Sequence, residues 1–104
     1  MTSRSDMPVV MQIVGLVSGD ECPFDGQFLV EYDPERDGTD PRGWPMMAHI
    51  VCTPHIRDAR RFTDFGEAHR VWTRTCRRDP VRPDGKPNRP LTAFTVSIGS
   101  PGTF

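Results

Sequence analysis

Apolar residues along the chain fall into four short runs with strand character. They cover residues 9–17, 27–32, 46–52 and 91–98. The first run is rich in β-branched residues at consecutive positions, which predicts a strand buried on both faces. In the second run the residues alternate, so Phe28, Val30 and Tyr32 are expected on one face and the residues between them on the other.

A helical pattern follows the third run and covers residues 64–78. Asp64 is a candidate N-cap, and Glu67 three residues later completes a capping box. Apolar and small side chains then recur at helical spacing along one face: Phe65, Ala68, Val71, Trp72, Thr75 and Cys76. Asp79-Pro80 should end this helix, and Thr53-Pro54 could start a shorter helical turn before it.

The segments between these runs have turn composition. Residues 33–45 form a long acidic loop, and residues 79–90 hold four prolines with a Pro-Asp-Gly turn at 83–85. The predicted order is therefore β-β-β-α-β, an α+β fold in which a small antiparallel sheet of about four strands carries one main helix on one face. We expect a single domain over residues 8–104, preceded by a flexible tail at residues 1–7.

Charge is distributed unevenly along the 104 residues. Residues 1–52 hold 3 Arg and 9 acidic residues, whereas residues 53–104 hold 10 basic and 5 acidic residues. The two halves could neutralise each other, stack against further copies of the chain, or offer a basic face to a polyanion. Three cysteines, an odd number without tight spacing, favour a reducing cytoplasmic location over secretion. No run is long enough to span a membrane, so no membrane partner is expected.

Candidate chemistry is sparse. His49, Cys52 and His55 have a spacing that invites a metal interpretation, but strand positions 49 and 52 point to opposite faces, so no metal site is expected. Two helical turns separate His69 from Cys76, about 10.5 Å along the axis, which is too far for a catalytic pair. Phosphate-loop, dinucleotide and hydrolase-elbow motifs are absent. We therefore expect no cofactor and no catalytic residue, and the balance is against an enzyme.

Arginines and one tryptophan remain as candidate binding residues. Arg70, Arg74, Arg77 and Arg78 would share one side of the predicted helix, with Arg82 following in the proline-rich loop. Trp44 could be an exposed interface anchor or could fold back over the core. The preferred interpretation is a non-enzymatic module that binds a protein partner or associates with itself. The alternative is a binder of nucleic-acid phosphates that uses these arginines.

Several stretches resemble small uncharacterised proteins of GC-rich bacteria such as actinobacteria, and of their phages and prophages. The similar stretches run from Phe24-Asp25-Gly26 to Tyr32-Asp33-Pro34, from Ala59 through Phe62 to Trp72, and from Arg82 to Phe94. This resemblance implies an accessory role in a phage or other mobile element. It implies no activity and assigns no functional residue.

Overall fold

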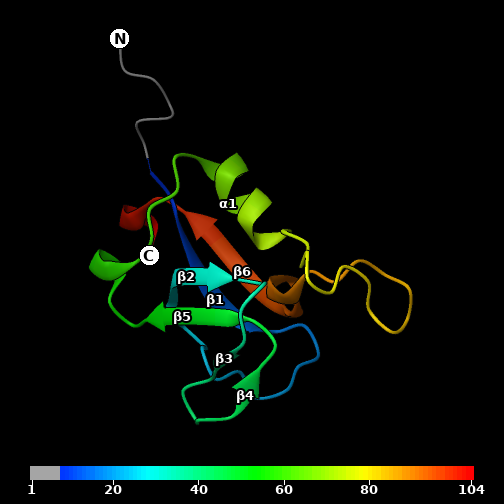
Figure 1. Ribbon diagram of the computed structural model, residues 1–104. Coiled ribbons are helices and arrows are strands. Elements are labelled where there is room, and N and C mark those ends of the chain that lie inside the picture. Colours follow the sequence, from blue (N-terminus) through cyan, green and yellow to red (C-terminus); the bar gives the residue numbers. More distant parts are fainter. Residues whose placement is uncertain (1–7) are drawn as a thin grey trace.

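The computed structural model describes residues 8–104 of the chain (Figure 1). The predicted tail at residues 1–7 lies outside the described residues. The elements in chain order are β1 (Val10–Leu16), β2 (Phe28–Asp33), β3 (Gly38–Thr39), β4 (Pro45–Met46), β5 (His49–Thr53), η2 (Ile56–Asp58), α1 (Phe65–Trp72), η3 (Pro90–Ala93), β6 (Phe94–Gly99) and η4 (Pro101–Thr103), where η marks a 3-10 helix.

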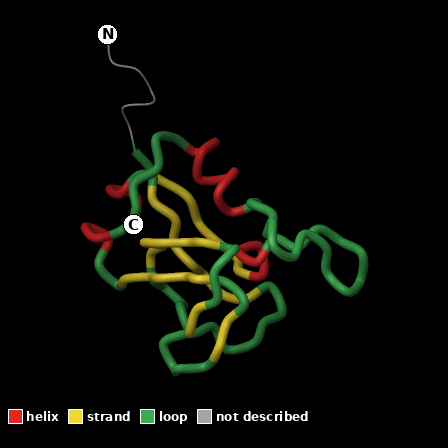
Figure 2. The backbone as a smooth tube through the Cα atoms, in the orientation of Figure 1, coloured by secondary structure: helices red, strands yellow, loops and turns green. Residues whose placement is uncertain are grey.

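Four strands form one antiparallel sheet in the order β5-β2-β1-β6. The first and last strands of the chain, β1 and β6, are neighbours in this sheet, with Val10 opposite Gly99 and Leu16 opposite Phe94. The predicted α+β fold is confirmed: a four-stranded antiparallel sheet carries one main helix (Figure 2). Within the fourth predicted strand, residues 91–93 belong to η3, because Pro90 begins a 3-10 turn there.

Two β-bulges change which side chains reach the core. One lies between Leu29 and Glu31 of β2, and the other lies between Ile13 and Gly15 of β1. An extra residue in one strand shifts the alternation of side chains beyond it. Leu29 and Tyr32 therefore belong to the same apolar cluster, three positions apart. The predicted grouping of Phe28 with Tyr32 on one face is wrong, because this bulge separates them.

The two faces of the sheet are covered by different apolar clusters. The main cluster comprises Met11, Ile13, Phe24, Leu29, Tyr32, Ala48, Ile50, Phe62, Ala68, Leu91 and Phe94. The smaller one comprises Val10, Phe28 and Ala59, with Ile56 packed against it. Val10 and its neighbour Met11 are both fully buried, as predicted for a strand covered on both faces. Val14 is half-exposed, so only the first part of β1 is buried on both faces of the sheet.

Helix α1 begins where the capping box predicts. The Asp64 carboxylate accepts the backbone N–H of Glu67 at 2.8 Å, and the Glu67 carboxylate accepts the N–H of Thr63 at 2.9 Å. Ala68 is fully buried, and the Trp72 indole N–H donates to the carbonyl of Phe94 in β6 at 3.2 Å. These contacts hold α1 against the sheet next to β6 (Figure 1).

The helix ends at Trp72, six residues before the predicted end at residue 78. Thr73 donates both its N–H and its hydroxyl to the carbonyl of His69, at 3.0 and 2.8 Å, and the chain then leaves the helical path. The backbone N–H and the thiol of Cys76 instead form hydrogen bonds with residues that are distant in the sequence. Its N–H donates to the carbonyl of Asn88 at 2.8 Å, and its thiol donates to the carbonyl of Pro34 at 3.1 Å. Tertiary hydrogen bonds thus override the helical periodicity of this segment.

The predicted apolar seam of the helix is also only partly correct. Phe65 is 58% exposed and stacks on the ring of His69, with centroids 6.2 Å apart. Cys76 is buried, but it lies beyond the helix. Within residues 8–104 the α-helix has eight residues, and no helix there is long and apolar enough to cross a bilayer.

Candidate interaction surface

The acidic loop between β2 and β5 contains a small ribbon that the sequence analysis did not predict. β3 and β4 pair antiparallel, with Gly38 opposite Met46 and Thr39 opposite Pro45. A side chain at Gly38 would force the backbone to shift, because its Cβ would lie 2.8 Å from the carbonyl oxygen of Ala48. The close approach fixes the ribbon against the start of β5, below the sheet in Figure 1.

Asp40 organises the turn between β3 and β4, residues 40–44, here called the Trp44 loop. One carboxylate oxygen accepts the backbone N–H groups of Arg42 and Trp44, at 2.9 and 3.0 Å. The other accepts the Arg42 guanidinium at 2.8 and 3.1 Å. Burial of Asp40 opposes ionisation, but the bonds from the Arg42 guanidinium and from the two N–H groups outweigh it, so the pKa of Asp40 lies below its usual value.

Trp44 projects from this loop into solvent. Its side chain is 67% exposed, and the guanidinium of Arg42 lies over the ring, 5.7 Å from its centroid. Two hydrogen bonds between Asp40 and Trp44 fix the turn. The Trp44 N–H donates to the Asp40 carboxylate, and the N–H of Asp40 donates to the carbonyl of Trp44 at 2.9 Å. The sequence left open whether Trp44 is exposed or folds back over the core, and in the structure it is exposed.

Residues 79–90, here called the proline hairpin, project from the body of the molecule (Figure 2). Val81 and Pro87 form an antiparallel bridge, and the N–H of Arg82 donates to the carbonyl of Lys86 at 2.8 Å. Gly85 adopts a φ of +85°, a conformation that favours glycine. Its N–H donates to the carbonyl of Arg82 at 2.9 Å and so closes the turn. The turn predicted at residues 83–85 is confirmed.

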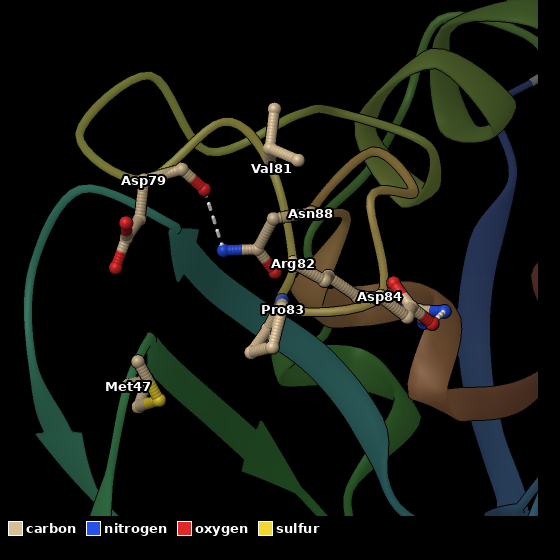
Figure 3. Close-up of a pocket in the computed structure, with 7 residues that line it drawn as sticks. All are labelled: Met47, Asp79, Val81, Arg82, Pro83, Asp84 and Asn88. Atoms are coloured by element: carbon tan, nitrogen blue, oxygen red, sulfur yellow. Dashed lines mark hydrogen bonds and ion pairs between the residues drawn. The ribbon is translucent and has the colours of Figure 1, made fainter.

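An open groove of about 850 Å³ separates the proline hairpin from Met47, the residue that follows β4. Its lining residues are Met47, Asp79, Val81, Arg82, Pro83, Asp84 and Asn88 (Figure 3). Met47 is 70% exposed and Val81 58% exposed, so two large apolar side chains border it. In Figure 3 the Asp79 carboxylate and the Pro83 ring extend from the hairpin toward the side of Met47. The groove is therefore mainly apolar, and its rim carries the Asp79 carboxylate beside the Arg82–Asp84 ion pair.

Ion pairs connect the chain segments that lead to the two sides of this groove, although the paired residues do not line it. Arg74 pairs with Glu35 at 2.8 Å, and Arg78 pairs with Asp37 at 2.7 Å. Arg78 also donates to the carbonyl of Met47 at 3.4 Å. The acidic first half of the chain and the basic second half therefore neutralise each other at this point, which was one of the three outcomes left open by the charge pattern.

The predicted stripe of helical arginines is not formed. Only Arg70 of the set lies within α1, because the helix ends before Arg74, Arg77 and Arg78. Arg82 pairs with Asp84 inside the proline hairpin. Within residues 8–104, Arg70 and Arg77 are the two members of the set that form no ion pair.

The other residues weighed for chemistry lie apart. His49 contacts the carboxylate of Glu31 at 2.9 Å, and no group of three potential metal ligands forms within the described part of the chain. Burial raises the pKa of the Cys52 thiol to about 12, so this thiol stays protonated and weakly nucleophilic at neutral pH.

Asp40, Met47 and Val81 were not singled out from the sequence. The usable signal was the Asp-Pro-Arg-Gly segment before Trp44, since aspartate at the start of a turn accepts N–H groups two residues on. No sequence signal brings Met47 next to the proline hairpin, because that contact depends on tertiary ion pairs.

Comparison with known proteins gives no relative from which a function could be transferred. No family model matches the chain, and no match is found among curated proteins or among solved structures. The functional interpretation therefore rests on the surface just described.

Proposed function

We propose that this protein is a non-enzymatic interaction module that binds a partner protein through Trp44. The observation that carries the proposal is a tryptophan 67% exposed on a loop fixed by a buried carboxylate. Trp and Arg are the residues most enriched among those that dominate binding energy at interfaces. Here the Arg42 guanidinium lies over the Trp44 ring, within the range of a cation–π contact.

Rigid presentation supports a binding role for this tryptophan. Fixing the loop in advance reduces the conformational entropy lost when the partner docks. Asp40 is only 8% exposed, whereas the Arg42 side chain is half-exposed. The Trp44 loop therefore presents an apolar ring and a positive charge together. The complementary partner surface is an apolar pocket with an acidic rim and an acceptor for the indole N–H.

The arginine pairing makes nucleic-acid binding a weaker proposal. Phosphate contacts need accessible cations, and Arg74, Arg78 and Arg82 are already paired with carboxylates of the same chain. The resemblance to small proteins of phages and prophages directs the search for a partner to proteins of a bacterial host or phage.

Site-specific crosslinking tests the proposal. A photoreactive aromatic residue at position 44, which keeps an apolar ring there, should crosslink a discrete protein in extracts of the source cell, and the same residue at position 65, another exposed aromatic site, should not. The captured protein is then purified and titrated calorimetrically. We expect Trp44→Ala to weaken binding at least about tenfold and Phe65→Ala to leave it unchanged.

Two results would contradict the proposal. One is equal crosslinking at positions 44 and 65. The other is a purified partner that binds wild type and Trp44→Ala with the same affinity. A crosslinked nucleic acid, with binding that falls steeply as salt rises, would favour the phosphate-binding alternative instead.

A further inference from the structure

The groove beside the proline hairpin has the chemistry that Trp44 and Arg42 require. Met47, Val81 and Pro83 supply apolar surface, and Asp79 supplies a carboxylate at the rim. Within residues 8–104 this carboxylate forms no ion pair. A volume of about 850 Å³ falls in the range of sites that hold small organic molecules, roughly 300–1,000 Å³, so an indole ring fits.

Trp44 does not occupy the groove of its own molecule. It is absent from the lining and is exposed to solvent. Met47 on the groove wall lies three positions after it in the sequence, so the two Cα atoms lie within about 10.5 Å of each other. A donor side chain and an acceptor groove this close together can be exchanged by two molecules across a two-fold axis, because each then gives and receives the same contact.

We infer that the partner is a second copy of this chain, and that each copy places its Trp44 in the groove of the other. This inference rests on the proposed role of Trp44. The indole ring contacts Val81, Pro83 and the side chain of Met47. The indole N–H donates to the Asp79 carboxylate, and Arg42 follows the ring toward the same acidic rim. Exposed apolar surface on both molecules is thereby removed from water.

The mass of the protein in solution tests this inference. Sedimentation equilibrium is run from about 1 µM to about 1 mM, the range in which weak complexes form. We expect the mass to rise from 11.7 kDa to twice that value and to stop there. Trp44→Ala and Val81→Asp should each raise the dissociation constant at least about tenfold, and Asp79→Asn should raise it less. Phe65→Ala, which removes an exposed aromatic ring from another surface, should have no effect.

Fluorescence of Trp44 provides a second readout. In a Trp72→Phe background Trp44 is the single tryptophan, and its emission should shift to the blue as the concentration rises. Val81→Asp should abolish that shift. Val81 is exposed, so this substitution leaves the core intact.

Three outcomes would overturn the inference: a monomer at all concentrations, a dimer that survives Trp44→Ala, or Trp44-dependent growth beyond the dimer. A monomer whose position 44 still crosslinks a different protein would reject the second copy as partner and retain the proposed function. A monomer without such a crosslink would reject both.

Discussion

The two tryptophans of the chain lie in opposite kinds of surroundings. Trp72 ends α1, packs against the main apolar cluster and donates its indole N–H to the carbonyl of Phe94. Trp44 is exposed, and its loop is fixed by hydrogen bonds to the carboxylate and the backbone N–H of Asp40 rather than by contacts of its ring with the core. Packing places the first side chain, whereas polar turn chemistry presents the second. This difference separates a structural role from the binding role proposed for Trp44.

The largest expected effect is a difference in the free energy of unfolding between the alanine variants of the two tryptophans. Trp72→Ala removes a partly buried ring and the hydrogen bond to β6, so the free energy of unfolding should fall by about 3 kcal/mol. Trp44→Ala removes an exposed ring and should change it by no more than about 0.5 kcal/mol. Urea unfolding followed by circular dichroism measures both. Equal losses would contradict the assignment of separate roles.

Alkaline titration tests the packing of the core, to which Trp72 belongs, through the buried Tyr32. Tyr32 is the single tyrosine of the chain, and burial of its hydroxyl, only partly offset by the backbone of Leu91, raises its pKa to about 12. The unfolded chain should ionise near pH 10. The raised pKa means that stability is full below pH 10 and falls as the pH rises toward 12.

Tyrosinate absorbance measures this difference directly. We expect it to develop near pH 12 in the native protein and near pH 10 in concentrated urea. In Tyr32→Phe, the decrease in the free energy of unfolding above pH 10 that Tyr32 causes should be absent. Native-state ionisation near pH 10 would show that Tyr32 is open to water.

Acid titration examines the Trp44 loop in the same way. The pKa of Asp40 lies below its usual 3.8, because the hydrogen bonds from Arg42 and Trp44 outweigh the opposing effect of burial. The ionised carboxylate therefore keeps the loop closed above pH 3.8, and this contribution is lost as the pH falls through the lower native pKa.

Hydrogen exchange at the backbone amides of Arg42 and Trp44 reports that closure. Asp40→Ala should accelerate exchange of these two amides on the order of tenfold at neutral pH, because their acceptor is gone. Asp25→Ala, which removes an exposed carboxylate elsewhere, is the matched control. Unchanged exchange in Asp40→Ala would mean that the carboxylate does not hold the loop.

The smallest expected effect concerns the ion pairs that join the acidic 33–37 segment to residues 74–78. Arg74→Ala removes the pair with Glu35 and should destabilise the fold by about 0.5 kcal/mol at low salt. Arg70→Ala removes an arginine without an ion pair in the described region and should change stability less. The difference should shrink in high salt, since screening weakens exposed pairs. A deficit that persists in high salt would assign Arg74 a packing role instead.

Local signals in the sequence located most of the sheet and the start of the helix. The four apolar runs and the Asp64–Glu67 capping box depend on neighbouring residues, so they could be recognised without a structure. The end of the helix could not, because Cys76 exchanges helical hydrogen bonds for partners at residues 34 and 88. The bulges likewise depend on strand pairing that a single segment does not encode.

The candidate surface was predictable only in part. Trp44 was identified, but its exposure depends on Asp40, and the adjoining groove depends on Arg78 holding the 37–47 segment beside the proline hairpin. Periodicity also assigned Arg74, Arg77 and Arg78 to a helical stripe that a continuous helix would have formed. Two of these three arginines are used in pairing instead.

The most direct test of the account combines nuclear relaxation of the two tryptophan backbone N–H groups with hydrogen exchange of their indole N–H groups, measured on dilute protein. We predict that the Trp44 indole proton exchanges rapidly with water while the order parameter of the Trp44 backbone N–H stays near 0.85, the value of a rigid backbone. The Trp72 backbone should be equally rigid, but its indole proton should exchange slowly. A backbone order parameter below about 0.6 for Trp44, or slow exchange of its indole proton, would contradict an exposed tryptophan on a rigid loop.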